Sequence, residues 1–417
     1  MQLKAILNSI ERYKGFVYSD IEWDKKALDK TLLISLRSRI GSKGFCSGCG
    51  EKGRCYDTLK SRRFQFVPLW GIIVYFIYAM RRIDCRSCGP TVEMVPWADG
   101  KKQNTKSFEW FLATWARRLS WKEVAEIFNS SWDTVFRAVE MAVEWGRSRM
   151  DMSGISSIGV DEIQWQRGHK YLTLVYQIDE RCKRLLWIGE ERTEATIRSF
   201  FDWLTPERSA LLKFVASDMW RAYLKVIAEK AGTAVHVLDR FHIMSHFSKA
   251  IDEVRAGEAR KMKERGLDPI LKNSRWCWLK RPENLTTTQG SLLSDLLKMN
   301  LKTVKSYILK EDFQNFWDYT SPIWAGRFLD EWCKRAMYSR IDPMKKVAKM
   351  LRKHRSLLLN WFIAKGAISS GVVEGLNNKV KLVTRKAYGF KSSRTIKAAL
   401  YHNLGGLPEP NHAHRFC

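Results

Sequence analysis

Two cysteine pairs, each with the spacing Cys-x-x-Cys, set the firmest limit on how this chain can fold. They are Cys46 with Cys49 and Cys85 with Cys88. Each pair can present two thiolates from one tight turn, and two such pairs complete a tetrahedral zinc site. The segment between them is rich in aromatic and β-branched residues, and its strands would form little core without the metal. The sequence therefore predicts a zinc-ribbon-like module with a structural Zn²⁺.

Two roles fit this zinc module. A knuckle that only folds the module is one interpretation, and a module that also grips DNA is the other. The second is supported by nearby arginines, namely Arg62, Arg63, Arg81, Arg82 and Arg86. A catalytic zinc is disfavoured because four thiolates leave no open coordination position. Cys55 lies close to the pattern but outside it, so we do not include it among the ligands.

The charge balance of the chain indicates a polyanionic partner. Lys and Arg number 72 and Asp and Glu number 44, a net charge of +28 over 417 residues. Nucleic acid is the first candidate partner, and an anionic membrane is the second. The N-terminal segment lacks an uninterrupted apolar run, so we expect no secretion signal. The most apolar stretch, residues 67–80, is shorter than the roughly 20 residues that a membrane span needs and is expected to form a buried strand.

Residues from about 106 to 145 follow a helical pattern. Ser120 and Glu123 have the spacing of a capping box, and apolar residues follow at helical intervals. After a short turn that starts at Asn129, a further helix begins in the segment 130–133. This arrangement resembles a helix-turn-helix, although an ordinary helical connector has the same pattern. Its position beside a basic zinc module favours DNA binding.

Between residues 158 and 238 the chain alternates between strand and helix patterns. Three strands suited to an antiparallel meander come first, followed by alternating helices and strands. The expected strands are 158–164, 171–178, 185–190, 212–216 and 234–238, and the expected helices are 194–204 and 221–231. This order is that of the ribonuclease H-like fold. We therefore predict a multidomain α+β protein with a ribonuclease H-like catalytic core.

Beyond His242 the chain becomes helical and rich in tryptophan until about residue 365. Six tryptophans lie in this region: Trp276, Trp278, Trp317, Trp324, Trp332 and Trp361. Such side chains could stack on flipped bases, but tryptophans in a helical bundle usually form its core, and we favour the core. The region is interpreted as a helical insertion into the catalytic core.

Asp161 and Glu162 end an apolar strand, where an acid is costly unless it serves a site. Side chains alternate along a strand, so Asp161 lies on the face opposite Ile158 and Val160, while Glu162 shares their face. That parity favours Asp161 over Glu162 as a site residue.

Two further acids complete a candidate active site. Asp218 follows the expected strand 212–216, where a loop can aim it at the centre of the sheet. Glu374 opens a helix, and between it and Lys397 basic residues appear with no other acid. Phosphodiester cleavage by two metals needs carboxylates that flank a pair of hard cations. Such a site can combine all three acids, with the insertion accounting for the distance of Glu374 from the other two.

Several motifs together resemble the bacterial insertion-sequence transposases of the ISL-three family. They are the doubled Cys-x-x-Cys, the helix-turn-helix, Val160-Asp161-Glu162, Ser217-Asp218-Met219-Trp220, Leu238-Asp239-Arg240-Phe241-His242, and the segments 370–377 and 385–390. The resemblance extends over nearly the whole chain. It implies a DDE transposase, in which water and then a DNA 3′-hydroxyl act as nucleophiles and no covalent enzyme intermediate forms.

The resemblance also implies roles for individual residues. Two Mg²⁺ (or Mn²⁺) ions would be held by the catalytic acids Asp161, Asp218 and Glu374. DNA phosphates would be contacted by Lys379, Lys381, Arg385 and Lys386. Charge supports that second role independently, although a solvated helix face is the alternative. Asp239 and His242 are secondary candidates for positioning a nucleophile or a DNA end, and a structural hydrogen-bonded pair explains them equally well.

The expected partners are double-stranded DNA, as terminal inverted repeats and as target, and further copies of the chain, since synapsis of two ends requires at least a dimer. No membrane partner is expected, and the resemblance implies a bacterial cytoplasmic, nucleoid-associated protein.

The rival functions are a ribonuclease H-like nuclease or resolvase and a domesticated, non-catalytic DNA-binding protein. The expected domains are zinc-binding at 1–100, helix-turn-helix at 101–151, the first part of the core at 152–250, the insertion at 251–365 and the last core helices at 366–417.

Overall fold

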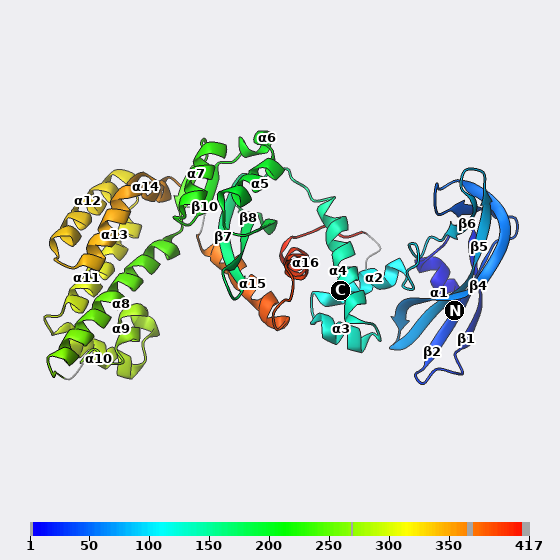
Figure 1. Ribbon diagram of the computed structural model, residues 1–417, viewed down its shortest axis with the longest axis horizontal. Coiled ribbons are helices and arrows are strands. Elements are labelled where there is room, and N and C mark those ends of the chain that lie inside the picture. The colour runs from blue at the N-terminus through cyan, green and yellow to red at the C-terminus, as the bar shows by residue number, and fades with distance from the viewer. Residues whose placement is uncertain (1–2, 268–269, 365–369, 411–417) are drawn as a thin grey trace. The chain divides into compact units, whose positions relative to one another are not determined.

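The chain divides into two compact units. The computed structural model describes residues 3–267, 270–364 and 370–410. Unit 1 combines Met1–Asp151 with the returning segment Leu382–Cys417, and unit 2 is Met152–Lys381 (Figure 1). The predicted domain boundary at residues 365 and 366 lies outside the described residues. Throughout the described ranges, every helix is too short or too polar to cross a lipid bilayer.

Unit 1 begins with α1 (Leu3–Ile10) and a six-stranded sheet of order β1-β2-β5-β4-β3-β6. Its strands are β1 (Phe16–Trp23), β2 (Thr31–Ser38), β3 (Gly44–Cys46), β4 (Lys52–Leu69), β5 (Ile72–Cys85) and β6 (Gly89–Met94). The stretch 67–80, expected as a buried strand, is divided between β4 and β5. Trp70 and Gly71 form the turn, with φ values of +51° and +78° that suit a tight hairpin.

The helical part of unit 1 follows the sheet. Its helices are α2 (Lys106–Ala116), α3 (Trp121–Ile127), α4 (Trp132–Arg147) and the returning α16 (Ser393–Leu404). The predicted capping box is present, with reciprocal hydrogen bonds between Ser120 and Glu123. The guanidinium of Arg147 lies 4.3 Å from the centre of the Tyr401 ring, so α16 packs on α4. The segment 366–417 is expected to form the end of the core. It is divided between the units at residues 381 and 382.

Unit 2 is built on a five-stranded sheet of order β11-β10-β7-β8-β9. Its strands are β7 (Ser157–Gln166), β8 (Lys170–Asp179), β9 (Cys182–Glu190), β10 (Phe214–Ser217) and β11 (Val235–Leu238). The first three form an antiparallel meander, and β10 pairs in parallel with both β7 and β11. All five predicted strands are present, with ends that differ by a few residues from the expectation.

The two faces of this sheet are covered by different helices. One face is covered by α5 (Glu194–Leu204) and α7 (Arg221–Lys230), and the short α6 (Pro206–Ser209) follows α5. The buried core on that face includes Ile158 and Val160 of β7, as the strand parity predicts. The other face receives α15 (Ser370–Lys386), which approaches β7 so closely that a Cβ on Gly159 would lie 2.6 Å from Val373 Cγ2. Figure 1 shows β7 and β8 between these helices.

The predicted helical insertion lies between β11 and α15. It consists of α8 (Arg240–Glu264), α9 (Arg275–Leu279), η1 (Pro282–Asn284), α10 (Thr287–Leu297), α11 (Lys302–Gln314), η2 (Asn315–Asp318), α12 (Pro322–Tyr338), α13 (Asp342–Lys353) and α14 (Arg355–Ile363). The core interpretation is confirmed for the tryptophans that are buried or packed against the core, Trp278, Trp317, Trp332 and Trp361. It is wrong for Trp276 and Trp324, which are exposed.

Candidate active site and metal centre

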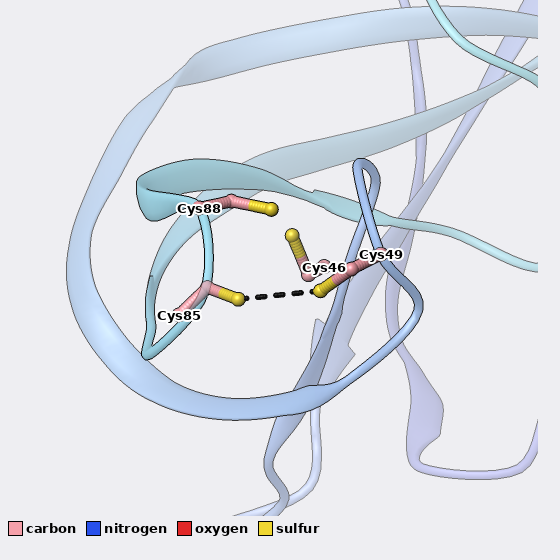
Figure 2. Close-up of side chains that lie close together, drawn as sticks. All are labelled: Cys46, Cys49, Cys85 and Cys88. Carbon is pink, nitrogen blue, oxygen red and sulfur yellow. Dashed lines mark hydrogen bonds between the residues drawn. The ribbon is translucent and has the colours of Figure 1, made fainter.

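The four predicted cysteines meet at one end of the first sheet. Cys46 ends β3 and Cys85 ends β5, and the strand pairing brings their turns together (Figure 2). All four sulfur atoms lie within 4.8 Å of one another, and Cys49 Sγ is 3.4 Å from Cys85 Sγ. Tetrahedral zinc with Zn–S bonds of about 2.3 Å separates its sulfur ligands by about 3.8 Å, so the cluster fits this metal. Cys55 is exposed and outside the cluster, as expected.

Backbone N–H groups favour the thiolate form of one cysteine in the cluster, Cys46. The N–H groups of Cys49 and Gly48 face the sulfur of Cys46 and lower its pKa to about 6. The hydrogen bond from Gly48 N measures 3.4 Å. A thiol that loses its proton near neutral pH ligates zinc at little cost, since the thiolate is the form that binds.

Most arginines around the zinc cluster already form ion pairs or hydrogen bonds within the protein. Arg81 is buried and pairs with the buried Glu93 at 2.7 Å, so it cannot contact DNA. Arg82 pairs with Asp57, and Arg63 pairs with Asp24. The support that these arginines lend to a DNA-gripping zinc module is therefore weaker than their number suggests.

Asp161 lies on the central strand β7, on the face covered by α15. It is buried, and its carboxylate accepts a hydrogen bond from the side-chain amide of Asn377 in α15. The amide oxygen of Asn377 accepts in turn from Tyr176 Oη of β8 at 2.8 Å. Burial raises the pKa of Asp161, and the nearby carboxylate of Asp218 adds to that effect. The strand β7, the helix α15 and the neighbouring strand β8 are thus joined through the side-chain amide of Asn377.

Asp218 directly follows β10, the parallel neighbour of β7, and is also buried. Its Oδ1 accepts from the backbone N–H of Trp220 at 2.9 Å, which orients the carboxylate. The preceding Ser217 lies 2.8 Å from His236 Nε2 through its Oγ, and burial lowers the pKa of that histidine to about 4. Asp161 and Asp218 therefore lie on adjacent strands, within reach of each other's charge.

Glu374, near the start of α15, is exposed. Its charge acts on Asp239, whose pKa is raised first by burial and further by the carboxylates of Asp161 and Glu374. His242 stands between the acids, with its Nε2 at 3.8 Å from Asp161 Oδ1 and 3.9 Å from Asp239 Oδ2. Among the described residues, the four cysteines lie close enough together to hold one metal ion, and the candidate acids lie farther apart than that.

Glu162, the competitor of Asp161, has a different partner. It forms an ion pair with Arg192, whose guanidinium stacks 4.0 Å from the centre of the Trp220 ring. Burial, with a contribution from the charge of Asp218, raises the pKa of Glu162 to about 7. The strand parity accounts for this arrangement, because Glu162 faces α7 and Asp161 faces α15.

The basic residues predicted to contact DNA are not equivalent. Lys379, Lys381 and Arg385 are exposed, whereas Lys386 is half-buried and donates to the carbonyl oxygen of Arg117 at 3.2 Å. Lys381 and Arg385 follow Glu374 at i+7 and i+11, so helical periodicity places them on its side of α15. Burial lowers the pKa of Lys386.

Asn377 contacts the candidate acid Asp161 but was not predicted from the sequence, although it belongs to the motif around Glu374. The available signal was its spacing, because a residue three positions after Glu374 lies on a neighbouring part of the same helix face. Tyr176 carried no comparable signal, since it reads as one more aromatic residue of a buried strand.

The family of the chain follows from comparison with known proteins. The family model of the ISL-three transposases, described as "Transposase", matches residues 158–400, which contain all three candidate acids. That match covers more than half of the chain, so the protein belongs to this transposase family.

Two named transposases are similar over most of their length. The chain is 28% identical to the transposase for insertion sequence element IS1001 of Bordetella parapertussis over 393 residues, which cover 93% of this chain and 95% of that protein. It is 29% identical to the transposase for insertion sequence element IS1557 of Mycobacterium tuberculosis over 419 aligned residues, with 94% and 93% covered. The predicted resemblance is thereby confirmed.

Proposed function

We propose that the protein is a DDE transposase that cleaves the ends of insertion-sequence DNA and joins them to a target, with Asp161, Asp218 and Glu374 as its catalytic acids. The observation that carries the proposal is the hydrogen bond between Asn377 and Asp161. Through this bond, the helix that bears Glu374 contacts the strand that bears Asp161, and the strand that Asp218 follows pairs with that strand.

A ribonuclease H-like core is part of this proposal. The supporting observation is the strand order β11-β10-β7-β8-β9, with an antiparallel meander and two further parallel strands. The division of the chain into a zinc module, a helix-turn-helix, a core and an insertion belongs to the same proposal.

The acids offer the hard oxygen ligands that Mg²⁺ and Mn²⁺ prefer. A pair of such ions, when bound, stabilises the attacking and the departing oxygen of a phosphodiester. The protein's own task is to hold the ligands: Asn377 fixes Asp161, and the N–H of Trp220 fixes Asp218. Glu374 is exposed, so its side chain can turn towards this pair when ions and DNA are present.

His242 and Asp239 act in this scheme as positioning residues. His242 lies between Asp161 and Asp239, and it is less buried than either acid. It can therefore donate a hydrogen bond to a water molecule or a 3′-hydroxyl that approaches Asp161 from the solvent side.

DNA contacts outside the acids come from several elements. Lys381 and Arg385 share the side of α15 that bears Glu374, which favours phosphate contacts close to the reacting bond. Lys379 and Lys386 are proposed for the same role with less support. The helix-turn-helix α2–α4 and the zinc module, with one structural Zn²⁺, would recognise the terminal inverted repeats. At least a dimer would act on DNA, in a bacterial nucleoid.

The experiment uses labelled duplexes that carry the inverted repeats flanking the gene, incubated with Mg²⁺ and a target plasmid. The wild-type protein should release cleaved and joined products. Asp161→Asn, Asp218→Asn and Glu374→Gln should each lower both products by roughly a thousandfold or more, as expected when a metal ligand is lost. Glu180→Gln, which changes an exposed acid in the turn after β8, is the matched control and should retain activity.

Each alternative outcome of this experiment would indicate a different function for the protein. Cleaved products without joined products would identify a nuclease or resolvase. Specific DNA binding with no metal-dependent product would identify a domesticated DNA-binding protein. Full activity in the three acid variants would show that the site assignment is wrong.

A further inference from the structure

A groove of about 860 Å³ lies within unit 1, and its lining contains none of the three proposed catalytic acids. Its walls are the end of α2, the starts of α3 and α4, the last turn of α15, the loop 387–392 and α16 as far as Asn403. The loop includes the segment Tyr388-Gly-Phe390 of the family-like motif. A groove of this size can hold several rings of a ligand.

Aromatic rings form one wall of this groove. Trp132 and Phe136 are stacked, with ring centres 5.6 Å apart and an interplanar angle of 23°. Trp121 packs behind them at 5.5 Å from each ring centre. Trp132 is 43% exposed, and Tyr388 on the rim is 99% exposed. Large aromatic side chains at the surface of a concave site are typical of ligand binding rather than of folding.

Among the residues that line the groove, basic ones outnumber acidic ones. Four cationic residues line the groove, Lys122, Lys386, Lys391 and Arg394, against one acid, Asp133. The side chains of Lys122 and Arg394 are 80% and 71% exposed, although they pair with Glu126 and Glu140. Lys391 is also exposed. The groove thus joins an apolar aromatic wall to a cationic rim.

We propose that this groove binds unpaired nucleotides of DNA, with a base stacked on Trp132 and a phosphate near Lys391. Aromatic rings bind the face of a base, and cations bind the backbone that runs beside it. A base inside a duplex has both faces covered by its neighbours, so it cannot use such a wall without leaving the stack. An apolar peptide would fit the rings but would gain nothing from the cations. The choice of DNA as the nucleic acid rests on the proposed function.

The test is a binding measurement with the full-length, zinc-loaded chain in buffer without Mg²⁺ or Mn²⁺. Two duplexes with one repeat sequence are compared, one blunt and one with a short unpaired extension that contains 2-aminopurine. The wild-type protein should bind the extended duplex roughly tenfold more tightly, as expected for one stacked base, and should quench the 2-aminopurine fluorescence.

Variants then locate the contact. Trp132→Ala and Tyr388→Ala should each reduce the preference for the extended duplex, and Trp132→Phe should retain part of it. Tyr388→Ala is informative even if Trp132→Ala folds poorly, because the Tyr388 side chain is almost fully exposed. Trp324→Ala, which removes an exposed tryptophan from the helical insertion, is the matched control and should keep the full preference.

Three results would overturn the proposal: equal affinity of the wild-type protein for both duplexes, an unchanged preference in both Trp132→Ala and Tyr388→Ala, or an equal loss of affinity for both duplexes in these variants. Because the assay contains no catalytic metal, it is independent of strand transfer. A protein that joins DNA ends but shows no preference would refute the groove alone. A protein that prefers the extension but joins nothing would refute the catalytic proposal alone.

Discussion

The side-chain amide of Asn377 donates a hydrogen bond to the carboxylate of Asp161, although the two residues are 216 positions apart in the sequence. The other end of the same amide accepts from the hydroxyl of Tyr176 at 2.8 Å, so its orientation is fixed. This contact ties α15 to the centre of the sheet. The Asp161 carboxylate is therefore held against the helix that bears Glu374.

Removing this contact should impair catalysis more than folding. Asn377→Leu keeps the branched shape of the side chain but loses the donor, and we expect strand transfer to fall roughly 10- to 100-fold, as for other residues that orient metal ligands. Tyr176→Phe should cause a smaller loss, because Asn377 can still donate. Initial rates at several Mn²⁺ concentrations measure the effect, and Asn300→Ala, in an exposed loop, serves as control. Unchanged rates in Asn377→Leu would refute this role.

Gly159 allows α15 to approach β7. A Cβ there would lie 2.6 Å from Val373 Cγ2 and 3.4 Å from Ile178 Cγ2, so Gly159→Ala should push the helix outwards. We expect a loss of roughly 1–3 kcal/mol in unfolding free energy and at least a tenfold lower strand-transfer rate. Gly159→Ala combined with Val373→Ala should recover part of both.

The control for Gly159 is Gly257→Ala in α8, where a Cβ would meet nothing within 4 Å. Equal losses in the single and the double variant would show that the clash with Val373 is not the cause.

Zinc binding should require the cysteine cluster and should not require the nearby thiol of Cys55. Cys85→Ser removes one of four thiolates, so the purified protein should lose its single bound zinc and the N-terminal sheet should become sensitive to protease. Cys55→Ser changes an exposed cysteine outside the cluster and should keep one zinc per chain. Mass spectrometry of metal content decides the matter. A Cys85→Ser protein with undiminished zinc would contradict the assignment.

His402 should make unit 1 sensitive to acid. It is buried in α16, and neither ring nitrogen has a hydrogen-bond partner among the described residues. Burial lowers its pKa to about 3, with the charges of Arg117 and Lys386 adding to the effect. Unfolded histidine has a pKa of about 6.5, so between these values only the unfolded state takes up the proton. The stability contribution is complete above about pH 6.5 and declines by about 1.4 kcal/mol per pH unit as the pH falls towards 3.

His402→Phe removes this proton uptake. Hydrogen exchange of α16 amides at pH 6.5, 5.5 and 4.5 should show protection that declines more steeply in the wild-type protein than in the variant. Parallel declines would show that another group causes the acid sensitivity.

The sequence was most informative where one residue type has one use. Paired cysteines predicted the cluster, and strand parity predicted which face Asp161 occupies. Long-range contacts were not predictable: no local pattern shows that Arg81 is buried against Glu93, or that α16 returns to pack on α4. The turn at Trp70 was missed because tryptophan seldom adopts a positive φ, although Pro68 and the Gly that follows Trp70 both signalled a break in the strand.

Iron-mediated cleavage of the chain tests most directly whether the three acids form one metal site. Fe²⁺ replaces Mg²⁺ in the DNA-bound protein, and with ascorbate and peroxide it generates radicals that cut the backbone next to the bound ion. Our account predicts breaks close to Asp161, Asp218 and Glu374, all suppressed by excess Mg²⁺ and all lost in Asp218→Asn. Breaks that spare the Glu374 segment, or that persist in Asp218→Asn, would contradict it.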